Sequence, residues 1–247
     1  MPSRTIPLSP AELAAISQRG KTLAEYHHAA SGAGHALVAS KPDTQNLRLF
    51  TLQKTESGWT VAIGRFSEDR KRFLIFCEAS QTADPHKFSI RKHDPARDDA
   101  GFHFVRAKAI DLAAVDFQLV QQKRKYSVMA LPAATGQIYV YVVPRQIYEG
   151  IYPLGGDIRY LVSEDGNTIL ERRPLHKNIL EMRVTNSSPR LHTHAMTDVP
   201  EDTDVFHVLI RKPACQEIIV TEHHVYTIEV DGGISYTGET ATLSMRF

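Results

Sequence analysis

The chain contains 247 residues with 42% hydrophobic and 23% charged side chains, and 29 Lys+Arg nearly cancel 28 Asp+Glu to leave a formal net charge of +1. This composition indicates an ordinary globular protein and excludes a disordered or fibrous chain. Without a basic excess there is no long-range field to attract polyanions, so we expect no nucleic-acid partner. No apolar run approaches the ~20 residues of a membrane span or forms a secretory signal, which predicts a cytoplasmic protein without membrane contact.

The residues that could bind a metal are unevenly represented. The chain has 12 histidines but only two cysteines, Cys77 in the apolar run "FLIFC" and Cys215 in the polar "KPACQE". Two cysteines in such different settings do not indicate a disulfide framework. A metal site in this chain would therefore be built from imidazole and carboxylate groups.

The first predicted element is an N-terminal helix. Ser9 can act as its N-cap, Pro10 occupies the first helical position, and Glu12 completes a capping box. Apolar residues at helical spacing follow: Leu13, Ile16, Leu23 and Tyr26. The small residues and glycines of "SGAG" at 31–34 are expected to end the helix.

Strand-like segments with turn residues between them come next. They predict an antiparallel meander formed by 47–53, 59–66, 72–80 and 87–93. We interpret 102–107 as a possible fifth strand and 111–125 as a short helix capped by Asp111. Small residues, proline and glycine in 126–137 indicate a boundary between two domains.

The second half is again rich in strand-like segments, at 138–143, 157–163, 168–173, 178–184 and 189–194. A short helix over 203–212 is stopped by Pro213, and two further strands follow at 217–222 and 225–230. We therefore predict an α+β fold with two β-rich domains. Residues 1–122 form an N-terminal helix and antiparallel meander, and residues 136–247 form a mixed α/β domain.

The stretch "RLHTHAMTDVPEDTDVFHV" at 190–208 is the main candidate for a functional site. In a strand, His192 and His194 point to the same face with their Cα atoms ~6.5–7 Å apart, so both imidazoles can reach one ion. The loop that follows supplies carboxylates: Asp198, Glu201, Asp202 and Asp204. Asp204 is best placed as the third ligand because it begins the predicted helix, and His207 on the same helical face competes with it.

The histidines also have structural interpretations. His192 and His194 can be hydrogen-bonded or hydrated at a strand end without any metal. The adjacent pairs 27–28 and 223–224 cannot face one side of a strand together, which favours surface or turn positions. His176 in "RPLHKN" is more typical of a packed or solvated histidine than of a ligand.

The stretch resembles the signature of the JAB/JAMM family of zinc isopeptidases, which is His-x-His followed by a loop with Ser and then Asp. The succession of one helix and two strands after the motif is similar to that family as well. Over the last ~100 residues, the resemblance implies a JAB-like domain with zinc held by His192, His194 and Asp204. It also implies a general base upstream, for which Glu149 in "YEGIYPLGG" stands at a suitable separation.

The sequence also departs from the family pattern. Ala195 stands where the family has Pro, the loop is about a residue shorter, and Glu201 or Asp202 replaces the Ser. The implied activity is zinc-dependent hydrolysis of peptide or isopeptide bonds in a protein or peptide substrate. The departures are equally compatible with an inactive relative of such an enzyme. The alternative from another class is a non-catalytic protein-binding or assembly module with no metal.

Overall fold

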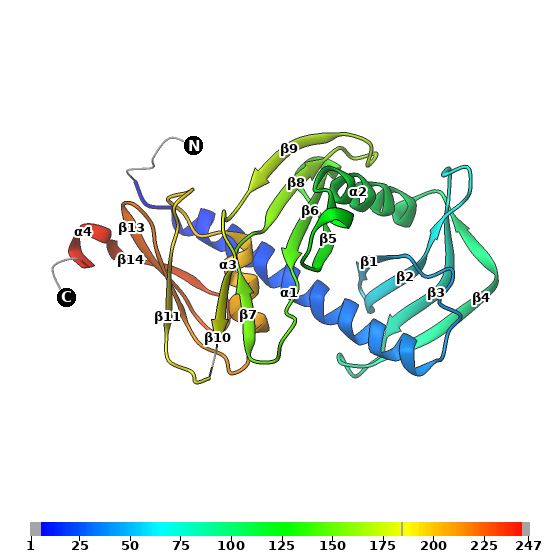
Figure 1. Cartoon of the computed structure of the whole chain (residues 1–247), viewed down its shortest axis with the longest axis horizontal. Coiled ribbons are helices and arrows are strands. Elements are labelled where there is room, and N and C mark those ends of the chain that lie inside the picture. Colours follow the sequence, from blue (N-terminus) through cyan, green and yellow to red (C-terminus); the bar gives the residue numbers. More distant parts are fainter. Residues whose placement is uncertain (1–5, 184, 244–247) are drawn as a thin grey trace.

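A 30-residue helix, α1 (Pro10–Ala39), runs along most of the molecule and connects its sheets (Figure 1). The computed structural model describes residues 6–183 and 185–243. The predicted capping box is present, since Ser9 Oγ accepts from Glu12 N at 3.3 Å and Glu12 Oε2 accepts from Ser9 N at 2.8 Å. The start of the helix is therefore confirmed.

The predicted end of α1 at 31–34 is wrong, because the helix continues to Ala39. Ala33 is fully buried, and a Cβ on Gly32 would lie only 2.8 Å from the Phe88 ring. Small residues here let the helix pack closely against the neighbouring strands. Tertiary packing therefore outweighs the low helix propensity of glycine.

The predicted meander is confirmed as an antiparallel sheet in the order β1-β2-β3-β4. Its strands are β1 (Leu49–Thr55), β2 (Gly58–Phe66), β3 (Phe73–Gln81) and β4 (Phe88–Asp99). The expected fifth strand at 102–107 is wrong, because this segment begins helix α2 (Phe102–Asp116). Asp99 Oδ1 accepts from Gly101 N at 3.1 Å and from Phe104 N at 3.0 Å. Asp111, expected as the cap, lies inside the helix.

A central antiparallel sheet follows in the order β5-β6-β8-β9. Its strands are β5 (Tyr126–Pro132), β6 (Ile138–Pro144), β8 (Ile158–Val162) and β9 (Ile169–Pro174), and two 3-10 turns precede and follow β5 at Leu119–Gln121 and Ala134–Gly136. Helix α2 packs on this sheet through Ala109, Ile110 and Ala113. Most of the segment expected to be a domain boundary, 126–137, is therefore a strand.

Two further sheets complete the fold beside the central one (Figure 1). One pairs β7 (Ile151–Leu154) with β10 (Leu180–Arg183), and the other has the order β11-β12-β13-β14 with β11 parallel to β12. The latter strands are β11 (Arg190–Thr193), β12 (Glu217–Val220), β13 (His224–Ile228) and β14 (Ile234–Glu239). Helices α3 (Asp202–Ile210) and α4 (Thr240–Leu243) belong to the same part of the chain. Val184, the last residue of the predicted strand 178–184, lies outside the described residues.

The largest hydrophobic core contains residues from both sides of the predicted boundary between 1–122 and 136–247. It combines side chains of α1 and the first sheet with Tyr141 of β6 and Phe206 of α3. Helices α1 and α3 approach so closely that a Cβ on Gly20 would lie 2.4 Å from Val205 Cβ. Helix α1 thus packs the part of the chain that contains α3 against the rest of the molecule.

Both cysteines are buried and free. Among the helices of the described residues, none combines the length and the hydropathy that are needed to cross a membrane.

Candidate metal centre

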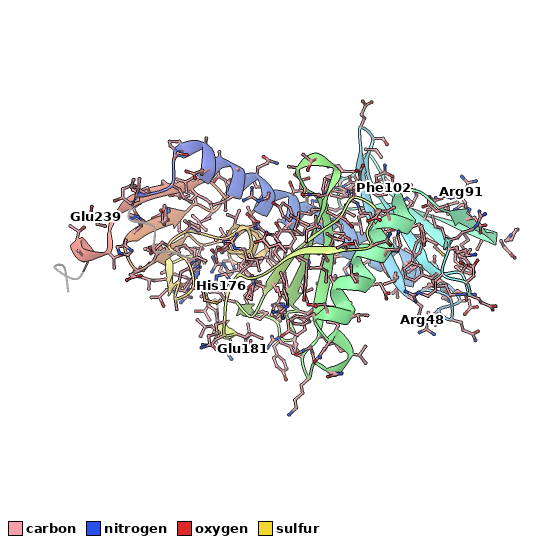
Figure 2. The ribbon with its side chains drawn as sticks, turned by 90° about the horizontal axis from the view of Figure 1, so that it is seen from above. Arg48, Arg91, Phe102, His176, Glu181 and Glu239 are labelled. Carbon is pink, nitrogen blue, oxygen red and sulfur yellow. The ribbon has the colours of Figure 1, made fainter. Side chains whose placement is uncertain are left out.

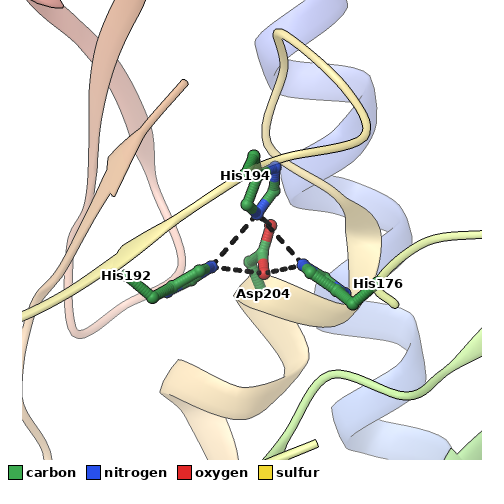
Figure 3. A group of neighbouring side chains, drawn as sticks. All are labelled: His176, His192, His194 and Asp204. Atoms are coloured by element: carbon green, nitrogen blue, oxygen red, sulfur yellow. Dashed lines mark hydrogen bonds and ion pairs between the residues drawn. The ribbon is translucent and has the colours of Figure 1, made fainter. Parts of the chain in front are cut away.

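Three imidazoles and one carboxylate from separate elements meet at a single point (Figure 3). His192 lies on β11 and His194 directly after it, Asp204 is in the first turn of α3, and His176 follows β9. The Nε2 atom of His194 lies 3.0 Å from that of His176 and 3.1 Å from that of His192. The Asp204 carboxylate lies 3.2–3.3 Å from all three Nε2 atoms.

The opposite ring nitrogens fix how the three imidazoles are oriented. Each Nδ1 atom faces an acceptor: Asp157 Oδ1 at 2.7 Å from His176, Glu217 Oε1 at 2.7 Å from His192, and Val199 O at 2.8 Å from His194. An Nδ1 that faces an acceptor carries the hydrogen, so in the neutral ring the Nε2 lone pair points to the centre. Three converging lone pairs repel one another unless a cation lies between them. This arrangement is typical of metal-binding histidines.

Asp204 gives a second indication that the site fits a cation. Its Oδ2 atom accepts from Glu201 N at 2.6 Å, whereas its Oδ1 atom is buried and accepts no hydrogen bond of good geometry. A buried carboxylate oxygen without a donor is costly unless a positive charge compensates it. Imidazole nitrogen and carboxylate oxygen are ligands of zinc and other first-row metals. The cluster of His176, His192, His194 and Asp204 could therefore hold a metal ion.

The electric field of the site favours positive charge at the same point. Burial lowers the pKa of His176, but the Asp157 and Asp204 carboxylates outweigh it and raise that pKa to about 11. Burial likewise opposes protonation of His192, but its interactions with the Asp204 and Glu217 carboxylates raise its pKa to about 9. The neighbouring imidazoles hold the pKa of Asp204 well below its usual range despite its burial. The surrounding carboxylates thus create a negative potential that favours a cation at this point.

The ligand atoms are close enough together for one ion to reach all of them. Separations of 3.0–3.3 Å join several of these atoms, and all four lie within 4.8 Å of one another. Zinc bonds of about 2.1 Å in a tetrahedral site place ligand atoms about 3.4 Å apart, which is close to the separations found here.

A cavity of about 220 Å³ opens onto the three histidines. His176, His192 and His194 line it, as do Lys177 and Asn178, which follow His176 in the chain. Of the His176 side chain, 11% is exposed, whereas the Asp204 side chain is fully buried. A small molecule or a peptide side chain can therefore approach the cluster from the histidine side.

A glycine allows a neighbouring loop to approach His176 closely. In the loop after β7, Gly155 has φ +83°, and a Cβ there would lie 2.4 Å from Asn178 O and 3.0 Å from His176 Cβ. The same loop leads into Asp157, whose carbonyl accepts from Leu175 N at 3.0 Å. Because glycine permits this approach, the loop can pack on the segment that carries His176.

The other carboxylates of the loop have different partners. They form ion pairs outside the cluster: Glu201 with Arg173 at 2.6 Å, Asp202 with Arg19 at 2.9 Å and Arg159 at 2.8 Å, and Asp198 with His223 at 3.1 Å. Burial raises the pKa of Glu201 to about 8 although Arg173 opposes this. Of the four candidates in the loop, only Asp204 reaches the histidines.

The structure thus brings together His192, His194 and Asp204, the three residues that the sequence indicated. His207, the competing candidate, is buried elsewhere on α3, and neither ring nitrogen has a hydrogen-bond partner among the described residues. Glu149 is exposed in the turn before β7 and is not a member of the cluster.

Sequence reasoning missed His176 as a ligand. It precedes His192 by 16 residues and has no motif around it. The available signal was "LGGD" at 154–157, where two glycines and an aspartate indicate a close approach of the backbone to another polar segment.

Comparison with known proteins adds no family to these observations. A scan against protein-family models, a search of curated proteins and a search of solved structures gave no match.

Proposed function

We propose that this protein is a metal-dependent hydrolase of peptide or isopeptide bonds that uses zinc. The observation that carries the proposal is the convergence of three Nε2 atoms and a buried carboxylate at the wall of an open cavity. A purely packed histidine cluster would not need four ligand atoms within 4.8 Å of one another and an acceptor behind each ring.

His176, His192, His194 and Asp204 would hold the ion. Zinc at this position supplies a Lewis acid that lowers the pKa of water toward ~7 and polarises a carbonyl group. Asp157 and Glu217 act as positioning residues, because each accepts the Nδ1 hydrogen of one ligand and holds that ring in place. Burial of Asp204 excludes solvent behind the ligands and strengthens their electrostatic interactions.

An extended peptide is the substrate shape that the surroundings favour. Strand β11 is at the edge of its sheet, and no other strand in the described part of the chain pairs with its second edge. The N–H groups of Arg190 and His194 bond toward the β12 side, so those of Leu191 and Thr193 face outward. A peptide added along this edge would pass beside His192 and the cavity.

A second function is supported by the number of protein ligands. Four protein ligands are typical of structural zinc sites, so the same cluster would also suit a protein-binding or assembly module that a metal stabilises. The two functions differ in what the ion contributes. In a hydrolase its removal abolishes turnover, whereas in a binding module its removal lowers stability and there is no turnover to lose.

The test is hydrolysis of a peptide substrate and of an isopeptide-linked substrate by protein purified without a His-tag. We expect turnover that a chelator abolishes and stoichiometric zinc restores, and that His194→Ala abolishes permanently. His86→Ala is the matched control, because His86 is exposed in the turn between β3 and β4. Zinc binding without turnover of either substrate would refute the hydrolase and support the structural role.

A further inference from the structure

Two adjoining cavities lie along the flank of α1, and none of the residues that line them belongs to the metal cluster. The larger has a volume of about 610 Å³ and lies among α1, β1 and β5, and the smaller, of about 340 Å³, extends toward α3. His27, Ser127 and Arg145 line both. The larger cavity is within the range of ~300–1,000 Å³ that small-molecule sites occupy.

The walls of both cavities carry positive charge and no carboxylate. Arg48 and Arg145 line the larger cavity, Arg145 and Lys212 line the smaller, and neither wall contains Asp or Glu. The chain as a whole has almost equal numbers of both charges. This local separation of charge therefore requires a specific explanation.

The three cations are also without a carboxylate partner among the described residues. Most of the arginines that line the central sheet do have one, as Arg159 does in its 2.8 Å contact with Asp202. Around the cavities the charges repel instead: burial, together with the charges of His28 and Arg145, lowers the pKa of His27 to about 4. The positive potential here is not neutralised by the protein itself.

The lining of the larger cavity also contains apolar side chains. They are Phe50 and Leu52 of β1 and Val128 and Met129 of β5, together with the Tyr126 ring. Guanidinium groups bind phosphate oxygens through pairs of hydrogen bonds. Aromatic and aliphatic side chains pack against a flat apolar part of a ligand. A ligand that uses both surfaces is an anion with an apolar or aromatic part.

We propose that the larger cavity binds a phosphorylated small molecule with an aromatic body, the chemical class of a nucleotide, with the phosphate held by Arg48 and Arg145. The site is separate from the metal cluster, since Figure 2 shows Arg48 well removed from His176 along the molecule. The proposal therefore does not depend on the proposed hydrolase activity.

The test is calorimetric titration of the full chain with AMP, ATP and pyrophosphate. We expect AMP and ATP to bind, and the Arg48→Ala/Arg145→Ala double variant to weaken both at least about tenfold, because each guanidinium contributes charge-assisted hydrogen bonds. Both side chains are exposed, so the variant should fold. Arg91→Ala is the matched control: Arg91 is exposed on β4 near the end of the molecule formed by the first sheet (Figure 2).

His194→Ala should bind AMP and ATP as the unmodified chain does, which excludes coordination of the phosphate at the metal cluster. A second measurement uses the unmodified chain alone: AMP should protect Arg48 and Arg145, but not Arg91, from a guanidinium-modifying dione. The proposal is overturned by any of three results. These are no binding of AMP and ATP, equal affinity for pyrophosphate, and binding of an oligonucleotide but of no mononucleotide.

Discussion

The Nε2 atoms of His176 and His194 lie 3.0 Å apart, although one residue follows the central sheet and the other follows an edge strand of the C-terminal sheet. Their Nδ1 atoms face different acceptors, Asp157 Oδ1 and Val199 O. Two separately oriented rings that meet lone pair to lone pair form a preorganised site. The fold, rather than a local motif, therefore builds this centre.

Glu217→Gln should weaken zinc binding while the fold persists. Glu217 is buried between His192 Nδ1, at 2.7 Å, and the Arg211 guanidinium. The amide keeps the shape but removes the charge that orients and polarises His192, and changes of this kind typically cost about 10–100-fold in metal affinity. Competition with a chromophoric chelator measures this loss. Glu181→Gln, at an exposed carboxylate paired with Arg124, is the control; equal affinity in both variants would contradict the positioning role.

Acid should destabilise the protein partly through His207. Its burial lowers the pKa to about 4, below the ordinary value of 6.5 that it regains on unfolding. Between these two pKa values, the unfolded chain binds a proton at His207 that the folded chain does not bind. The free energy of unfolding is therefore fully retained above pH 6.5 and falls as the pH drops toward 4. Over that window His207 should contribute up to about 3 kcal/mol.

The comparison for His207 is with His207→Gln. Urea unfolding at intervals between pH 7 and 4 should show a smaller loss of stability in the variant, because glutamine does not titrate. Equal losses of stability in the two proteins would show that the pKa of His207 is not lowered in the folded state.

Two glycines of α1 should respond in opposite directions to alanine. A Cβ on Gly20 would lie 2.4 Å from Val205 Cβ and 2.6 Å from the Asp202 carbonyl, so Gly20→Ala should push α3 away and destabilise by about 1–3 kcal/mol. Gly34 has no atom within 4 Å of its Cβ position, so Gly34→Ala should stabilise the helix by up to about 1 kcal/mol. Thermal unfolding measures both. A stable Gly20→Ala would mean that the two helices are not in close contact.

Local sequence signals predicted those elements whose structure depends mainly on residues that are close together in the chain. The capping box at Ser9, the antiparallel meander and the strand that carries His192 and ends just before His194 depend on neighbours in the chain, and the structure has all three. The segment 102–107 was interpreted as a possible fifth strand of the meander. The cap from Asp99 and the packing of Ala107 against the first sheet make it helical instead.

The candidate site was predictable only in part for the same reason. His192, His194 and Asp204 lie within 13 residues of one another, so their spacing gave a geometric expectation. His176 reaches them through a contact between two loops that depends on Gly155 and on the Asp157 carboxylate. Contacts of this kind join segments that no short motif connects.

The metal content of the purified chain tests the central claim most directly. Protein prepared without a His-tag and analysed by elemental mass spectrometry should contain close to one equivalent of zinc, and the His192→Ala/Asp204→Ala double variant should contain almost none while His86→Ala keeps it. A chain that remains metal-free after incubation with zinc, and whose thermal stability zinc does not change, would contradict the account.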